Sequence, residues 1–223
     1  MKIMIIAAHP DDEILGCGGT VARLTQEGKA EADEVFTLIL SNGITSRDNW
    51  DKKELEDLKV KSAEANYMVG VPWIAIEDLP DNQFDKVPLL DVIKKIDKHI
   101  KFHLPDIIFT HYANDLNIDH RITYQAVITA TRPMQNESVK EIYSFEVLSS
   151  TEWNYPTTFS PDTFYDITDT LNTKLQALAC YDSEMRDSRH PRSMTGVWNN
   201  AKMWGLKSGL EYAEAFKTVR CIR

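Results

Sequence analysis

The stretch KIMIIAAHPDDEILGCGG, residues 2–19, joins a continuous apolar run to a histidine and three consecutive acidic residues. The run 2–8 has the composition of a parallel strand that is covered on both faces. Residues 14–27 place apolar side chains on one helical face, and Gly28 follows as a stop signal. Charge crowded at such a junction is costly unless a cation compensates it. The stretch therefore predicts a strand, an acidic exit loop and a helix, with a cation at the loop.

Strand-like and helical segments alternate through the first two thirds of the chain. The further segments that predict strands are 34–41, 73–77, 106–111 and 139–147, and those that predict helices are 52–69, 89–102 and 120–131. Strands that alternate with helices are typical of an open, mostly parallel sheet with right-handed crossovers. We therefore expect an α/β fold, a Rossmann-like three-layer sandwich.

The last third, 149–223, has a less regular pattern. Residues 149–161 predict a loop, and 164–168 predict a short strand followed by a helix to about Met185. The polar stretch 187–200 predicts no element. We expect a single domain over 1–223, with its core in 1–148 and an irregular C-terminal part.

Composition narrows the classes of function. The 223 residues include 43% hydrophobic and 26% charged residues, as in ordinary globular proteins, and the formal net charge of -9 argues against nucleic-acid and anionic-membrane binding. Three widely spaced cysteines indicate reduced thiols rather than a disulfide framework. Acidic residues follow the apolar run at the start of the chain too soon for a signal peptide, and no window of the sequence resembles a membrane span. These features predict a cytoplasmic protein.

Metal-capable side chains follow two of the predicted strands. His9, Asp11 and Asp12 follow the first strand, and His120 belongs to the segment 111–121 after the fourth. Ligands bind at the carboxyl ends of parallel strands, so these segments are expected to meet. Two imidazoles and one carboxylate are typical of catalytic zinc, and Fe2+ accepts the same ligands. Asp11 would then be free to take a proton from metal-bound water.

Simpler interpretations exist for each motif. Asp12 and Glu13 would also stabilise a helix N-terminus through its dipole, and His120 alone could be an exposed residue at a helix start. Glu13 is expected to support the site rather than bind metal. The glycines at 16–19 suggest a dinucleotide-binding loop, but their spacing is wrong and the acids before them would repel phosphate. Close packing of the helix on the sheet explains them better.

Taken together, these motifs resemble the PIG-L/LmbE-like N-acetyl-sugar deacetylases. The resemblance rests on AAHPDDEILGCGGT (7–20), LPDNQFD (79–85) and DLNIDHR (115–121), with weaker similarity in YDSE (181–184) and YAEAF (212–216). It extends over roughly residues 1 to 135.

The resemblance implies one Zn2+ held by His9, Asp12 and His120, with Asp11 as the general base. The implied reaction is hydrolysis of an N-acyl amide, commonly the acetamide of a GlcNAc-type sugar or sugar conjugate, with release of acetate and a free amine. A homo-oligomer is also a reasonable expectation from the resemblance.

One position departs from the family pattern. The family often reads H-x-D-H in the second motif, where the first histidine assists at the oxyanion or the leaving group, and this chain has Asn117 there. An amide donates a hydrogen bond but cannot transfer a proton. Either Asp11 returns the proton, or another group such as His111 or His190 replaces the histidine.

Carboxylates near the motifs are candidates for supporting roles. Asp115 and Asp119 are expected to orient His120, and Asp119 is counted with Asp11 and Asn117 among the catalytic residues. Asp81 follows the third strand, where it could brace the site or form an Asx turn.

Arg47 and Arg192 are the candidate substrate-binding residues. Arg47 could equally be a surface arginine, and RHPRS (189–193), which could close over substrate, could equally be a flexible loop. Specificity is expected in the loops 42–51, 149–161 and 187–200. A phosphoester substrate would need a cationic pocket, and the sequence offers few clustered bases near the two motifs. The alternatives are a metal-dependent hydrolase of a different amide or ester, and an inactive metal-binding module, which only Asn117 favours.

Overall fold

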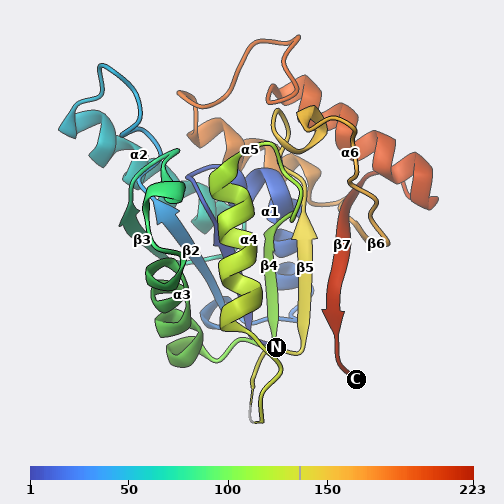
Figure 1. The fold of residues 1–223 in the computed structure, drawn as a ribbon. Helices are drawn as coiled ribbons and strands as arrows, with labels where there is room; N and C mark the ends of the chain where they lie inside the picture. Colours follow the sequence, from blue (N-terminus) through green and yellow to red (C-terminus); the bar gives the residue numbers. More distant parts are fainter. Residues whose placement is uncertain (136) are drawn as a thin grey trace.

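A computed structural model describes residues 1–135 and 137–223, and it contains a seven-stranded sheet with the order β3-β2-β1-β4-β5-β7-β6 (Figure 1). The strands are β1 Ile3–Ala7, β2 Val35–Ser41, β3 Trp73–Leu79, β4 Ile107–His111, β5 Glu141–Phe145, β6 Thr163–Asp166 and β7 Ala213–Cys221. The first five strands pair in parallel, and β7 runs antiparallel to β5 and β6. The α/β class with a mostly parallel sheet is confirmed.

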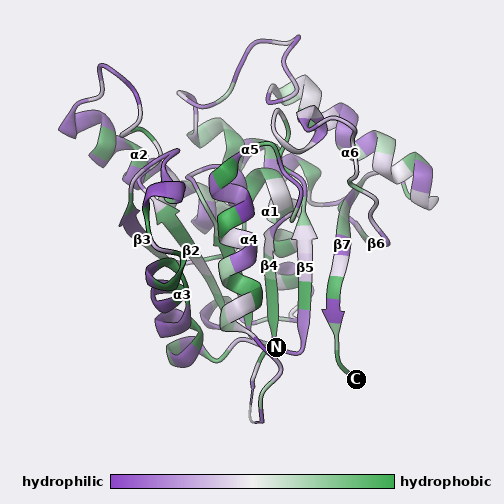
Figure 2. Cartoon of the chain, viewed as in Figure 1, coloured by the Kyte–Doolittle hydropathy of each residue, from purple (hydrophilic) through white to green (hydrophobic). Residues whose placement is uncertain are grey.

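Helices cover both faces of the sheet and complete three layers. They are α1 Asp12–Gln26, α2 Lys52–Met68, α3 Leu89–His103, α4 Ile118–Ala130, α5 Leu171–Cys180 and α6 Met194–Ser208. Successive residues of β1 point to opposite faces, so Ile3 and Ile5 join the core under α1, α2 and α5. Met4 and Ile6 join the core under α3 and α4. In Figure 2 the apolar colour accordingly follows β2 and β4, whereas α3 is largely polar.

The C-terminal third contains more regular structure than its sequence indicates. Helix α6 begins inside 187–200, where the sequence predicts no element, and the helix expected to reach Met185 ends at Cys180. Glycine and asparagine give α6 a weak intrinsic propensity, so the helix depends on packing of its buried side chains Val197, Ala201 and Trp204.

Strand β7 also extends the sheet in a region expected to be irregular. Charged residues interrupt its apolar pattern, and one of them, Glu214, is buried because it pairs with Lys174 of α5. Antiparallel pairing with β5 and β6 then provides its backbone partners. Of the helices within the described ranges, none has the length and apolar character needed to cross a membrane.

The order of the strands brings the two sequence motifs together. Strand β1 lies between β2 and β4, with Ile6 opposite Thr110. The segments that follow β1 and β4 therefore leave the sheet at the same edge. The following helices begin two residues earlier than predicted, at Asp12 and Ile118. Residues more than a hundred positions apart therefore share one edge of the sheet.

Candidate active site and metal centre

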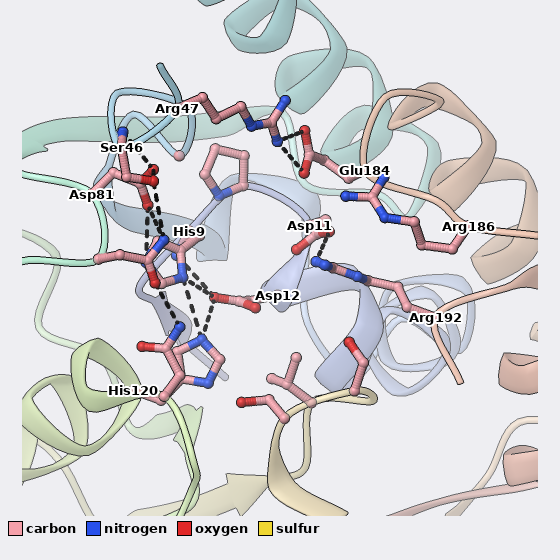
Figure 3. A pocket seen from close by; sticks show the side chains of 17 residues that line it. His9, Asp11, Asp12, Ser46, Arg47, Asp81, His120, Glu184, Arg186 and Arg192 are labelled. Carbon is pink, nitrogen blue, oxygen red and sulfur yellow. Dashed lines mark hydrogen bonds and ion pairs between the residues drawn. The ribbon is translucent and has the colours of Figure 1, made fainter. Parts of the chain in front are cut away.

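His9, Asp12 and His120 form a compact triangle of ligand atoms at this edge (Figure 3). Asp12 Oδ2 lies 3.2 Å from His9 Nδ1 and 3.3 Å from His120 Nε2, and the two nitrogens are 3.3 Å apart. A tetrahedral zinc ion with ligands at its usual bond lengths separates them by about 3.3 Å. The three side chains expected from the sequence therefore fit one such ion without rearrangement.

Each of the two imidazoles has a carboxylate at its other nitrogen. His9 Nε2 lies 3.0 Å from Asp119 Oδ2 and 3.5 Å from Asp81 Oδ1, and His120 Nδ1 lies 3.1 Å from Asp115 Oδ1. Such carboxylates fix the orientation of ligating histidines. Asp115 is against His120 as expected, but Asp119 lies against His9 rather than His120, because the first turn of α4 directs the two side chains differently.

The electrostatics of the triangle favour a cation. Burial alone lowers the pKa of His9, but Asp119 and Asp12 outweigh it and raise that pKa to about 10. Burial likewise opposes protonation of His120, yet Asp12 and Asp115 raise its pKa to about 9. The carboxylates therefore stabilise positive charge among these side chains, as a metal site requires.

Asp11 is held beside the triangle in an unusual backbone conformation. Its φ of 97° is rare for a residue with a side chain, and it precedes α1 without capping the helix. Its N–H donates to Glu13 Oε2 at 3.1 Å, and its carboxylate instead accepts a 3.0 Å bond from Arg192 Nη1. Burial raises the pKa of Asp11 well above its ordinary value, and Arg192 partly counteracts this. The carboxylate is thus available to chemistry at the metal site.

Glu13 supports this arrangement from inside the core. Its carboxylate accepts hydrogen bonds from Asn66 Nδ2 at 2.9 Å and from the Tyr181 hydroxyl, in addition to the Asp11 amide. The residue is buried and lies outside the ligand triangle. Its supporting position agrees with the sequence-based expectation.

Asn117 lines the cavity but already makes structural hydrogen bonds. Its Oδ1 accepts the Asp119 N–H at 2.8 Å, which caps α4, and its Nδ2 donates to Asn82 Oδ1 at 3.0 Å. The alternative acid His111 is fully buried: its Nε2 accepts the Ala8 N–H and its ring stacks on His120. His190 accepts the Arg192 N–H and packs edge-on against Trp153. Neither histidine is among the described residues that line the cavity.

A cavity of about 230 Å³ opens over the triangle. Arg47 lines it and donates through Nη2 to both oxygens of Glu184, at 2.6 and 2.7 Å. Asp81 is buried at its edge and accepts two bonds from Ser46. The lining residues are His9, Pro10, Asp11, Asp12, Gly43, Ser46, Arg47, Asp81, Asn82, Asn117, His120, Val147, Ser149, Ser150, Glu184, Arg186 and Arg192.

Three arginines reach the cavity, although the sequence shows few clustered bases near the two motifs. Arg47 reaches the cavity from the loop after β2, whereas Arg186 and Arg192 reach it from the segment after α5, which folds back over the carboxyl edge of the sheet. The sequence analysis named Arg47 and Arg192 but missed Arg186 and Glu184. The YDSE similarity at 181–184 was the available signal for Glu184, whereas no local pattern distinguishes Arg186 from a surface arginine.

Several known proteins are similar to this chain in sequence or in fold. Diacetylchitobiose deacetylase from Thermococcus kodakarensis is 28% identical over 98% of this chain and 83% of its own. 4-Oxalmesaconate hydratase from Pseudomonas putida is 27% identical over 79% of this chain and 71% of its own. The solved structure of N,N'-diacetylchitobiose deacetylase from Pyrococcus horikoshii covers 98% of this chain and 84% of its own, with 22% identity and a TM-score of 0.78.

A family model, PIG-L: GlcNAc-PI de-N-acetylase, matches residues 4–131. That range contains the whole ligand triangle, Asp11 and both strand exits that carry them. The chain therefore belongs to the PIG-L family of de-N-acetylases, enzymes that hydrolyse amide bonds.

Proposed function

We propose that this protein removes the N-acetyl group from a GlcNAc-type sugar or sugar conjugate, in a zinc-dependent hydrolysis that releases acetate and a free amine. The observation that carries the proposal is the triangle of His9, Asp12 and His120, with sides of 3.2–3.3 Å, beside the carboxylate of Asp11, which does not cap α1. Bound zinc would lower the pKa of a coordinated water and polarise the amide carbonyl.

The residues of the chain have distinct roles in this reaction. Asp11 accepts the proton of the attacking water, and its fixed backbone keeps the carboxylate at the metal site. Arg192 holds that carboxylate in place through Nη1. Asp115 and Asp119 keep the two ligating imidazoles oriented.

The departing amine needs a proton, and Asn117 cannot provide one. Its hydrogen bonds to Asp119 and Asn82 make it a cap and a wall of the cavity. Since neither His111 nor His190 lines the described cavity, Asp11 is the group that returns the proton to the nitrogen. One carboxylate then acts first as base and afterwards as acid.

A second candidate is addition of water to an unsaturated acid. The hydratase relative and Asn117 favour it, because hydration of a double bond releases no amine. The hydroxyl and the proton of one water add to the two carbons, and Asp11 would carry that proton. Both reactions would draw on the same metal position and on Asp11, so the test must distinguish them by substrate.

The test is amine release from a panel of N-acetylated sugars and conjugates, with chelated protein restored by zinc or by ferrous iron. We expect zinc-dependent release that falls at least about a hundredfold in Asp11→Asn, with zinc still bound. Asp33→Asn, at an exposed aspartate remote from the cavity, is the matched control.

Release that persists in Asp11→Asn would assign the base to another group. If no member of the panel releases amine while zinc is bound, and the protein hydrates an unsaturated acid, the deacetylase proposal is wrong.

A further inference from the structure

We infer that Arg186 and Arg192 form an anion subsite, and that the substrate of the proposed deacetylation carries a phosphate or carboxylate group in addition to its acetamide. The inference rests on the proposed function for the identity of the substrate, but the subsite itself follows from the geometry of one loop.

The loop between α5 and α6 presents both guanidinium groups to the cavity. The N–H of Arg186 donates to the carbonyl of Arg192 at 3.0 Å, so the two residues lie side by side although six positions separate them. Both side chains line the cavity, and Figure 3 shows them on the flank opposite His9 and His120.

The charge of this flank is incompletely compensated. Arg47 is paired with both oxygens of Glu184, but Arg192 contacts Asp11 through Nη1 alone. Arg186 donates through Nη1 to the backbone carbonyls of Ser183 and Met185, and within 1–135 and 137–223 no carboxylate pairs with it. One guanidinium is thus uncompensated, and both retain N–H donors.

Two adjacent guanidinium groups with free donors recognise phosphate or carboxylate oxygens, frequently in bidentate fashion. Neutral sugar hydroxyls need no such charge. The acidic side chains Asp12, Asp81 and Asp119 gather at the opposite flank, around His9. The division of charge orients the substrate, with its acetamide at the metal site and its anionic group at the loop.

The experiment compares substrates that differ only in the anionic group. N-acetylglucosamine is the neutral member, N-acetylglucosamine 1-phosphate carries a phosphate, and N-acetylmuramic acid carries a carboxylate. The measured quantity is the ratio of kcat/KM for each anionic substrate to kcat/KM for the neutral sugar. The two anionic members show which of the two groups the loop selects.

We expect Arg186→Gln to lower the kcat/KM ratio of the preferred anionic substrate about 10- to 100-fold, which is the effect of losing one charged hydrogen-bonding group. Arg186→Lys should keep part of the preference, because it retains charge without the planar fork. Arg189→Gln is the matched control: Arg189 is exposed on the same loop but does not line the cavity. Arg186 is itself exposed and pairs only with carbonyls, so its variants should fold.

A second readout does not depend on turnover. Binding of N-acetylglucosamine 1-phosphate to chelated protein, measured by isothermal titration calorimetry, should weaken in Arg186→Gln and not in Arg189→Gln. If release is equal for neutral and anionic sugars, the anion subsite is refuted while deacetylation stands. If no sugar is deacetylated but binding depends on Arg186, the subsite stands and the proposed function fails. If no sugar is deacetylated and binding does not depend on Arg186, both the subsite and the proposed function are refuted.

Discussion

At the scale of single residues, the geometry of the site depends on the carboxylate that contacts the second nitrogen of each candidate histidine ligand. His9 and His120 face the metal position with one nitrogen and a carboxylate with the other. Burial opposes ionisation of Asp115, but His120, together with the hydroxyls of Ser150 and Thr151, lowers the pKa of the Asp115 carboxyl to about 2. It therefore stays ionised, and keeps its hold on the imidazole, through the neutral range.

Asp115→Asn should weaken zinc binding about 10- to 100-fold, because the amide orients His120 less strongly than a carboxylate does. Competition with a chromophoric chelator measures the affinity, and Asp33→Asn is the exposed control. An unchanged zinc affinity in Asp115→Asn would show that the triangle is held by packing alone.

At the scale of elements, helix α1 approaches the sheet closely because of its small residues. A Cβ atom built on Gly16 would lie 2.3 Å from Phe145 Cδ2, on strand β5. The glycines at 16–19 thus permit close packing, as expected, and the triangle benefits because α1 carries Asp12. Phe145 also packs against His111, which stacks on His120.

Gly16→Ala should lower the free energy of unfolding by about 1–3 kcal/mol, since displacement of the Phe145 ring outweighs the better helix propensity of alanine. Gly18→Ala should cost less, because its new Cβ would meet Ile14 Cγ2 at 2.9 Å, a smaller overlap than the one with the Phe145 ring. Urea denaturation compares the variants, and equal losses would contradict the packing argument.

Helix α6 is tied to the sheet by a buried carboxylate. Glu146, just after β5, accepts hydrogen bonds from Asn200 at 2.8 Å and from Trp204 at 2.5 Å. Burial nevertheless raises the pKa of Glu146. The folded state then binds more protons than the unfolded state between the unfolded and folded pKa values, so this group's contribution to stability falls as pH rises through that window.

Glu146→Gln keeps an acceptor for α6 and removes the ionisation. We expect the stability of the variant relative to the wild type to increase from pH 4.5 to pH 8, as measured by urea denaturation at each pH. Glu56→Gln, at an exposed glutamate, should show no such trend. A difference that decreases with pH would mean that the ionised form of Glu146 is the better tether.

At the scale of the whole molecule, a buried ion pair joins the C-terminal part to the N-terminal motif. Lys174 of α5 pairs with Glu214 of β7 at 2.6 Å and also donates to the Leu15 carbonyl. Glu214 accepts the amides of Gly19 and Thr20 in α1, at 2.9 and 2.7 Å. The helix that carries Asp12 of the candidate metal site is therefore anchored by residues 159 to 195 positions away.

Lys174→Met should destabilise the fold by about 3–5 kcal/mol, because it leaves the buried Glu214 charge uncompensated. Lys217→Met is the matched control on β7: its pair with Asp162 is exposed, and such pairs contribute about 0–1 kcal/mol. Thermal or urea unfolding checks both variants. A loss in Lys174→Met no larger than in Lys217→Met would show that Glu214 finds other compensation.

The sequence by itself determined the parallel sheet and the ligand triangle. Continuous apolar runs specify strands covered on both faces, and the carboxyl ends of parallel strands meet at one edge, so the sequence alone predicted that His9, Asp12 and His120 would share that edge. The tertiary structure decided the rest: Asp119 against His9, the helix α6, and the arginines around the cavity. Those features depend on packing and on pairs of charges far apart in the chain, and neither leaves a local periodic pattern.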